Sequence, residues 1–266
     1  DIRHEVEGSF KEREVKLHKL PASSPEDDTF ELLSKVEFRT IDHRRQSRGI
    51  LFRTLLLKSF LSSPAACAST IENRLAKEAL EDETDADVQH DRAVLTDLAA
   101  ALEGVTIAEF RKFQHLLRLL RDLGLDKGRQ DNRVVVFSER IDTLQFLHKE
   151  LKRALCLPAD AVEVFHGTLD DQKQQKLVKS FGSDASPVRI LLASDAASEG
   201  INLHYHCHQM VHFDLPWSLI TLEQRNGRID RYGQEQTPHI DYLLTIPGNP
   251  DLQGDLRVLD ILIERE

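Results

Sequence analysis

The chain has 266 residues, 40% of them hydrophobic and 30% charged, which is enough to bury one substantial core and a smaller second one. Its formal net charge of −10 argues against a general polyanion binder, because non-specific nucleic-acid affinity grows with the number of phosphates that Lys and Arg neutralise. We therefore expect any anion binding to be local and to depend on geometry.

Cysteine and methionine usage indicates the setting of the protein. The three cysteines, Cys67, Cys156 and Cys207, are too scattered for a disulfide framework and favour a reducing, cytoplasmic environment. The chain starts at Asp1 and its single methionine is Met210, so we expect it to be part of a longer protein. The sequence has no run of about 18 apolar residues and no signal-peptide pattern, which argues against membrane insertion and secretion.

Residues 1–130 are predicted to be mainly helical, without a strand of alternating apolar residues. Residues 50–61 carry apolar side chains at helical spacing. Ser63 suits the N-cap of a following helix and Pro64 suits its first position. Residues 81–91 are acidic and poor in apolar residues, which predicts a solvated linker or an exposed helix face.

Another helix is predicted before residue 131. Thr106 and Glu109 have the spacing of a capping box, and Gly124 can end the helix. The apolar positions between them follow a helical stripe, namely Ile107, Phe110, Leu117 and Leu120.

From residue 131 short apolar runs alternate with helical stretches. Strands are predicted at 133–137, 162–165, 188–193, 209–213 and 240–246. Helices are predicted at 139–154, at 170–181 with a capping box of Thr168 and Asp171, and around the arginines near residue 228. Buried strands separated by helices imply a parallel sheet with right-handed crossovers.

Ligands of such sheets sit beyond the carboxyl ends of the strands. Polar or small residues follow the predicted strands at these positions: Ser138, Arg140, His166, Gly167, Ser194, Asp195, Glu199, Gly200 and Asp214.

The segment 223–234 places Arg225, Arg228 and Arg231 three residues apart, roughly on one side of a helix. Gly227 costs about 1 kcal/mol of helix stability relative to alanine, which indicates a bend or a close backbone approach. The arginines could pair with neighbouring carboxylates of Glu223 and Asp230 on a surface helix. They could also reach the terminal phosphates of a nucleotide across an interface. The spacing alone leaves both interpretations open.

The chain lacks the other half of a nucleotide site. No glycine is followed by lysine, so a P-loop is absent from the sequence. The acidic pair Asp82 and Glu83 lies in a polar stretch instead of at the end of an apolar strand. We therefore interpret the arginine segment as one side of a composite site.

Five stretches carry a family pattern: 135–138, 165–167, 192–203, 213–217 and 224–234. In this order they resemble the C-terminal RecA-like lobe of superfamily 2 helicases, and most of all the Swi/Snf-like translocases of the RapA type. The element Gln-Arg-x-Gly-Arg-x-x-Arg, which begins at Gln224, is the most specific part. Residues 10–18 and 56–65 resemble, more weakly, the exit from a first lobe and the helical segment between lobes.

The resemblance implies an α/β fold, with a RecA-like parallel sheet flanked by helices at 131–250. A mainly helical inter-lobe region would occupy 1–130, and residues 251–266 would be a C-terminal extension. The parent protein would be an ATP-dependent helicase or translocase that uses ATP and Mg²⁺ bound mainly by an absent N-terminal RecA-like lobe. This chain alone would bind neither and would be inactive.

The resemblance also implies residue roles. Arg228 and Arg231 match the family's arginine fingers, and Gln224, Arg225 and Gly227 belong to the same motif. Glu199, Gly200 and Asn202 match the element that couples nucleotide state to the nucleic-acid strand. The positions that match contacts to the phosphate backbone are Ser138, Arg140, His166, Gly167 and Ser194. Hydroxyls and backbone amides at strand ends can bind phosphates on an acidic protein.

The implied partners are nucleic acid, with duplex DNA favoured, and the first lobe of the same protein, without a membrane. RNA polymerase or a defence complex is a further candidate, and the expected location is cytoplasmic and nucleoid-associated. The sequence departs from eukaryotic relatives after Trp217, where Ser218 and Leu219 replace Asn-Pro, so a chromatin role is not inferred.

Three alternatives stay open. The lobe could be a catalytically inactive module used for protein interaction. His204, His206 and His208 alternate and could bind zinc, but ligands on an extended strand would be spread over about 13 Å, and we expect no metal site. Trp217 could stack on a base, although a core or interface role is the more common one.

Overall fold

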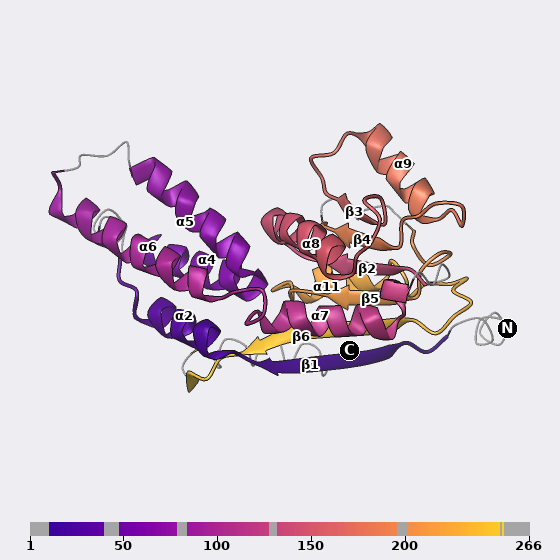
Figure 1. The fold of residues 1–266 in the computed structure, drawn as a ribbon, viewed down its shortest axis with the longest axis horizontal. Helices are drawn as coiled ribbons and strands as arrows, with labels where there is room; N and C mark the ends of the chain where they lie inside the picture. Colours follow the sequence, from indigo (N-terminus) through magenta and orange to yellow (C-terminus); the bar gives the residue numbers. More distant parts are fainter. Residues whose placement is uncertain are drawn as a thin grey trace. The chain divides into compact units, whose positions relative to one another are not determined.

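The computed structural model describes residues 11–39, 48–78, 84–127, 132–195, 202–250 and 252. Contacts divide these residues into two compact units, one drawn from 11–19 and 115–244 and the other from 20–114 and 245–252. In the part of the chain so described, no helix is both long and apolar enough to cross a membrane. Figure 1 shows the fold.

The second unit is built from helices: α2 (Ser24–Lys35), α4 (Arg48–Ser62), α5 (Pro64–Glu78), α6 (Ala86–Gly104) and the first turn of α7 (Arg111–Asp122). The junction of α4 and α5 confirms the predicted cap, because Ser63 Oγ accepts a hydrogen bond of 3.0 Å from the backbone N–H of Ala66. Pro64 then occupies the first helical position, where its missing N–H costs nothing.

Two helix starts differ from the prediction. Helix α7 begins at Arg111, and Thr106 and Glu109 form a turn before it, closed by a 3.0 Å bond from Glu109 N to Thr106 O. Helix α6 begins at Ala86, so most of the described part of the acidic segment is helical; of the two predicted alternatives, the linker is wrong and the helix is observed. Asp91 of this segment is fully buried, and its carboxylate is compensated by a 2.7 Å hydrogen bond that it accepts from the Arg39 backbone N–H.

The strands are β1 (Glu14–Pro21), β2 (Val134–Phe137), β3 (Val162–Phe165), β4 (Ile190–Ala193), β5 (Gln209–His212) and β6 (His239–Ile246). They form one sheet of order β1-β6-β5-β2-β4-β3. The sheet is parallel, with Val134 opposite both Ile190 and Gln209. Strands β2 and β4 are buried along their whole length, which confirms the RecA-like α/β prediction.

Strand β1 corrects the prediction that residues 1–130 contain no strand (Figure 1). It is an edge strand whose side chains are exposed or only partly buried. Edge strands tolerate charged residues. The apolar alternation in β1 is limited to Val15 and Leu17, so it is hard to recognise among the charged and polar residues around it, which are Glu14, Lys16, His18 and Lys19.

Helices α8 (Ile141–Ala154), α9 (Asp171–Phe181) and α11 (Leu219–Asn226) follow β2, β3 and β5, and the short 3-10 helix η1 (Leu125–Lys127) precedes β2. Helix α8 packs against β3 and β4, and α9 against β3. The N-cap of α9 is Asp170, whose carboxylate accepts Lys173 N at 2.8 Å, so the predicted box of Thr168 and Asp171 is wrong.

Candidate functional site

The carboxyl ends of four neighbouring strands lie side by side because the hydrogen-bond ladder continues past them. Ser138 N donates to Ala193 O at 3.1 Å, and Ser194 N donates to Phe165 O at 2.9 Å. On the other side, Phe213 N donates to Phe137 O at 3.0 Å. The structure thus brings the predicted positions Ser138, Ser194 and His166 to one edge of the sheet.

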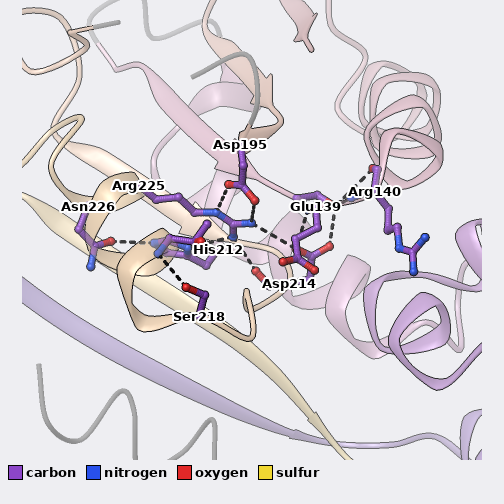
Figure 2. Close-up of polar contacts among 10 residues, drawn as sticks. Glu139, Arg140, Asp195, His212, Asp214, Ser218, Arg225 and Asn226 are labelled. Atoms are coloured by element: carbon purple, nitrogen blue, oxygen red, sulfur yellow. Dashed lines mark hydrogen bonds and ion pairs between the residues drawn. The ribbon is translucent and has the colours of Figure 1, made fainter. Parts of the chain in front are cut away.

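Arg225 is the centre of a buried polar network at this edge (Figure 2). Its side chain is 1% exposed, yet all three guanidinium nitrogens have partners. Nε and Nη2 bind Asp195 Oδ1 and Oδ2 at 2.5 and 2.8 Å, and Nη1 donates to Asp214 O at 2.9 Å. The guanidinium carbon also lies 5.5 Å from the centre of the Phe137 ring. Arg225 therefore ties helix α11 to the ends of β2, β4 and β5.

The Arg225 guanidinium keeps its charge in spite of burial. Desolvation lowers its pKa, but the hydrogen bonds that it donates to Asp195 and the charges of Asp214 and Asp195 outweigh desolvation and raise the pKa. A bidentate pair of this kind compensates desolvation only while both partners remain.

A chain of hydrogen bonds continues from Arg225 into the core. Arg225 Nη1 lies 3.4 Å from His212 Nδ1, and since arginine can only donate, Nδ1 is the acceptor. His212 Nε2–H then donates to Asn226 Oδ1 at 2.8 Å, and Asn226 Nδ2 donates to the Tyr242 hydroxyl at 2.8 Å. Burial, followed by the Arg225 charge, lowers the pKa of His212 well below its ordinary value, so this imidazole is neutral.

Asp214 links the network to the loop after β2. Ser138 Oγ donates to Asp214 Oδ2 at 2.5 Å, and Glu139 N donates to Asp214 Oδ1 at 2.9 Å. Arg140 N donates to Ser138 Oγ at 3.2 Å. Ser138 is fully buried, so its hydroxyl orders the loop, while the Arg140 side chain points away from Asp214 (Figure 2).

Two other predicted positions flank this loop. Ser194 is 6% exposed and its Oγ has no hydrogen-bond partner among the described residues. His166 is half-buried, with Nδ1 2.6 Å from Thr168 Oγ1, and Gly167 is exposed.

The arginine segment is not one continuous helix, contrary to the sequence-based prediction. Helix α11 ends at Asn226, and Gly227 is its C-cap, with φ −61° and its N–H bonded to Glu223 O at 2.9 Å. Arg228 and Arg231 lie beyond this end. The predicted bend at Gly227 is thus a helix end, which separates these two arginines from the buried Arg225.

Contacts after the helix end join the arginine segment to the one before β5. Leu203 N donates to Arg228 O at 3.0 Å, and Arg231 Nη1 donates to Asn202 Oδ1. Arg228 is half-buried, and the exposed side chains are Asn202, Gln224 and Arg231. The predicted Glu199 and Gly200 lie outside the described residues.

The carboxylates proposed as partners in a surface helix bind a different arginine. Arg13 Nη1 lies 3.2 Å from Asp230 Oδ2 and 3.6 Å from Glu223 Oε2. This pairing connects the start of β1 to the arginine segment within one unit.

Sequence reasoning named Asp195 and Asp214 only by their positions after strands, and it missed His212, Asn226 and Tyr242. A carboxylate after each of two strands that follow one another in the chain was the available signal for a buried arginine. Within the described ranges, no group of three or more His, Cys, Asp or Glu side chains could hold a metal ion. The three alternating histidines His204, His206 and His208 therefore do not form such a group.

The family model of the helicase conserved C-terminal domain matches residues 111–233. An uncharacterized ATP-dependent helicase YqhH of Bacillus subtilis is 48% identical over 58 residues, which is 22% of this chain and 10% of that protein. The RNA polymerase-associated protein RapA of Vibrio campbellii is 32% identical over 119 residues, 44% of this chain and 12% of that protein. The chain therefore spans about a tenth of the length of these relatives.

Two solved structures share the fold. The Hef helicase domain of Pyrococcus furiosus has a TM-score of 0.60 at 16% identity, covering 95% of this chain and 59% of that one. The SWI2/SNF2 ATPase core of Sulfolobus solfataricus in complex with dsDNA has a TM-score of 0.53 at 16% identity, covering 88% and 41%.

Proposed function

We propose that this chain supplies half of an ATP-dependent nucleic-acid translocase, because residues 111–233 match the helicase conserved C-terminal domain and the chain resembles the C-terminal RecA-like lobe of the Swi/Snf-like superfamily 2 type. The observation that carries the proposal is the separation of roles in the arginine segment. Arg225 is buried in the core, whereas Arg228 and Arg231 lie after the C-terminal end of helix α11.

In this proposal Arg228 and Arg231 act as arginine fingers. A permanently charged guanidinium stabilises the negative charge that develops on a transferred phosphoryl group. ATP and Mg²⁺ would be held mainly by a first RecA-like lobe. The ion pair of Asp195 with Arg225 and the helix end at Gly227 would fix the position of the segment from which the Arg228 and Arg231 side chains reach the nucleotide.

Nucleic acid would contact the side of the sheet formed by the carboxyl ends of the strands. Ser194, His166, Gly167 and Arg140 would approach the phosphates of one strand, together with N–H groups at the starts of α8 and α9. Ser138 would act indirectly, by holding the Glu139–Arg140 loop on Asp214. Glu199, Gly200 and Asn202 would couple this contact to the arginine segment.

Duplex DNA is the favoured substrate, supported by the dsDNA complex of the Sulfolobus neighbour, and RNA polymerase is a candidate partner, supported by the description of RapA. A cytoplasmic, nucleoid-associated location belongs to the same proposal.

The test is the ATPase rate of the full-length parent with and without duplex DNA. Arg228→Ala should lower the DNA-stimulated kcat by about 10³-fold or more while DNA binding is retained. Arg121→Ala, which removes an exposed arginine of α7, is the matched control and should leave the rate unchanged. If Arg228→Ala keeps the stimulated rate, the finger assignment fails.

A further inference from the structure

A polar cavity of about 390 Å³ lies within the lobe, at the amino ends of the parallel strands. Its lining includes Arg133, which directly precedes β2, and residues 204–208, which directly precede β5. Gly182, Asp184 and residues 233–236 complete it. Because the strands are parallel, this is the edge of the sheet opposite to Ser138, Ser194 and Asp214.

Specific contacts hold the walls of this cavity in place. Gln234 Nε2 donates to Cys207 O at 3.0 Å and to Ile229 O at 3.1 Å. Cys207 Sγ donates to Arg133 O at 3.3 Å. The His206 ring lies so close to Gly182 that a Cβ there would come within 2.6 Å of it. The cavity is therefore a preformed feature of the fold.

Two buried side chains in the lining have nitrogen atoms without a protein partner. Arg133 is 6% exposed; its Nη2 binds Asp184 Oδ1 at 2.9 Å and Ser183 O at 3.1 Å, but its Nε bonds to none of the described residues. His204 is 4% exposed, and neither of its ring nitrogens has a partner among those residues. Buried polar groups are normally paired, so a ligand that forms hydrogen bonds with these nitrogens would satisfy them.

The chemistry of these groups selects the ligand. Arg133 is always charged and can only donate, so it repels a cation and requires an acceptor. His204 is neutral, because burial, then the charge of Arg231, then His206, lower its pKa, and a neutral imidazole still donates from one nitrogen. Asp184 and Glu235, also in the lining, are exposed carboxylates; Asp184 pairs with Arg133 Nη2, and solvent screens the charge of Glu235.

We propose that this cavity binds a small oxyanion, a phosphate group that is either free or part of a nucleotide, through Arg133 and His204. Residues 233–236 follow Arg231 after one intervening residue, so a bound oxyanion would also stabilise the segment that carries Arg228 and Arg231. The binding does not depend on helicase activity, and the two proposals can fail separately.

The test is a calorimetric titration of the 266-residue chain with inorganic phosphate, and in a second arm with ADP, at constant ionic strength set with chloride. Saturable binding is expected in at least one arm, with a chemical-shift change of the His204 ring nitrogens in ¹⁵N NMR. His204→Leu should weaken binding at least tenfold and should raise Tm without ligand, because it removes the unpaired polar atoms. His148→Leu, on α8, is the matched control and should bind as wild type.

Arg133→Met provides a second variant, and the NMR titration of the wild type decides the question if that variant does not fold. Saturation by phosphate without a change at His204 would overturn the proposal, as would the absence of saturable binding in both arms. Binding of Zn²⁺ with displacement of the His204 signals would instead establish a metal site and would also overturn it.

Discussion

Arg225, Arg228 and Arg231 share a spacing of three residues but differ in what surrounds them. Arg225 is desolvated and held by Asp195, Asp214 and His212, so its guanidinium interacts with groups of the protein itself. Arg231 is exposed and held only by Asn202 among the described contacts. Burial therefore separates Arg225, which holds segments of the fold together, from the residues that we propose to act on a ligand.

Replacing Arg225 should destabilise the fold strongly. Arg225→Met leaves Asp195 and the Asp214 carbonyl without their partner, and breaking a buried pair costs about 3–5 kcal/mol. Urea denaturation should show this loss in the free energy of unfolding. The matched variant Arg231→Ala, at an exposed arginine of the same segment, should change it by no more than about 0.5 kcal/mol, and equal losses would contradict the assignment.

His115 gives the fold a pH dependence. Burial, then the charges of His18 and Arg118, lower the pKa of His115 to about 4 from its ordinary 6.5. The unfolded chain therefore binds the proton more readily, so His115 destabilises the fold progressively as the pH falls from about 6.5 to about 4. His115→Gln cannot titrate, so its unfolding free energy should fall less than that of wild type over this range. Parallel curves for the two proteins would contradict the assignment.

At the scale of elements, glycines end two helices by different means. Gly124 has φ 73°, the left-handed conformation that a Cβ disfavours, at the end of α7. Gly227 has φ −61°, which any residue can adopt, and a Cβ there would lie 3.3 Å from Glu223 O. The sequence predicted a helix end at Gly124 and a bend or close backbone approach at Gly227, and of the two only Gly124 requires glycine for its backbone angle.

Alanine at these two positions should separate the two cases. Gly124→Ala should cost about 1–2 kcal/mol of stability because the left-handed conformation is strained. Gly227→Ala should cost less than about 1 kcal/mol, since it needs only a small displacement of a carbonyl. Thermal or urea unfolding of both variants tests the ranking, and a larger loss for Gly227→Ala would reverse it.

At the scale of the whole molecule, the proposed nucleotide site is incomplete in this chain. The arginine segment is present, whereas the sequence holds no P-loop to bind the phosphates. We expect the purified 266 residues to hydrolyse ATP at no more than the background rate, with or without duplex DNA. Measurable turnover that disappears in Arg228→Ala would show that this chain holds a complete site.

The sequence by itself determined five of the six described strands, the parallel sheet and the resemblance to the helicase C-terminal domain, because short apolar runs and the Gln-Arg-x-Gly-Arg motif leave local patterns. The sequence did not predict β1. An edge strand is held by backbone hydrogen bonds to one neighbouring strand, so it can be charged and needs no apolar alternation.

Only the tertiary structure decided the roles of Asp195, Asp214, His212 and Arg225, because burial and pairing depend on contacts between segments distant in the sequence. The same reason applies to the cavity beside Arg133 and His204. Each residue is ordinary in its own segment, and only the fold leaves their nitrogens buried in the walls of one cavity without a protein partner.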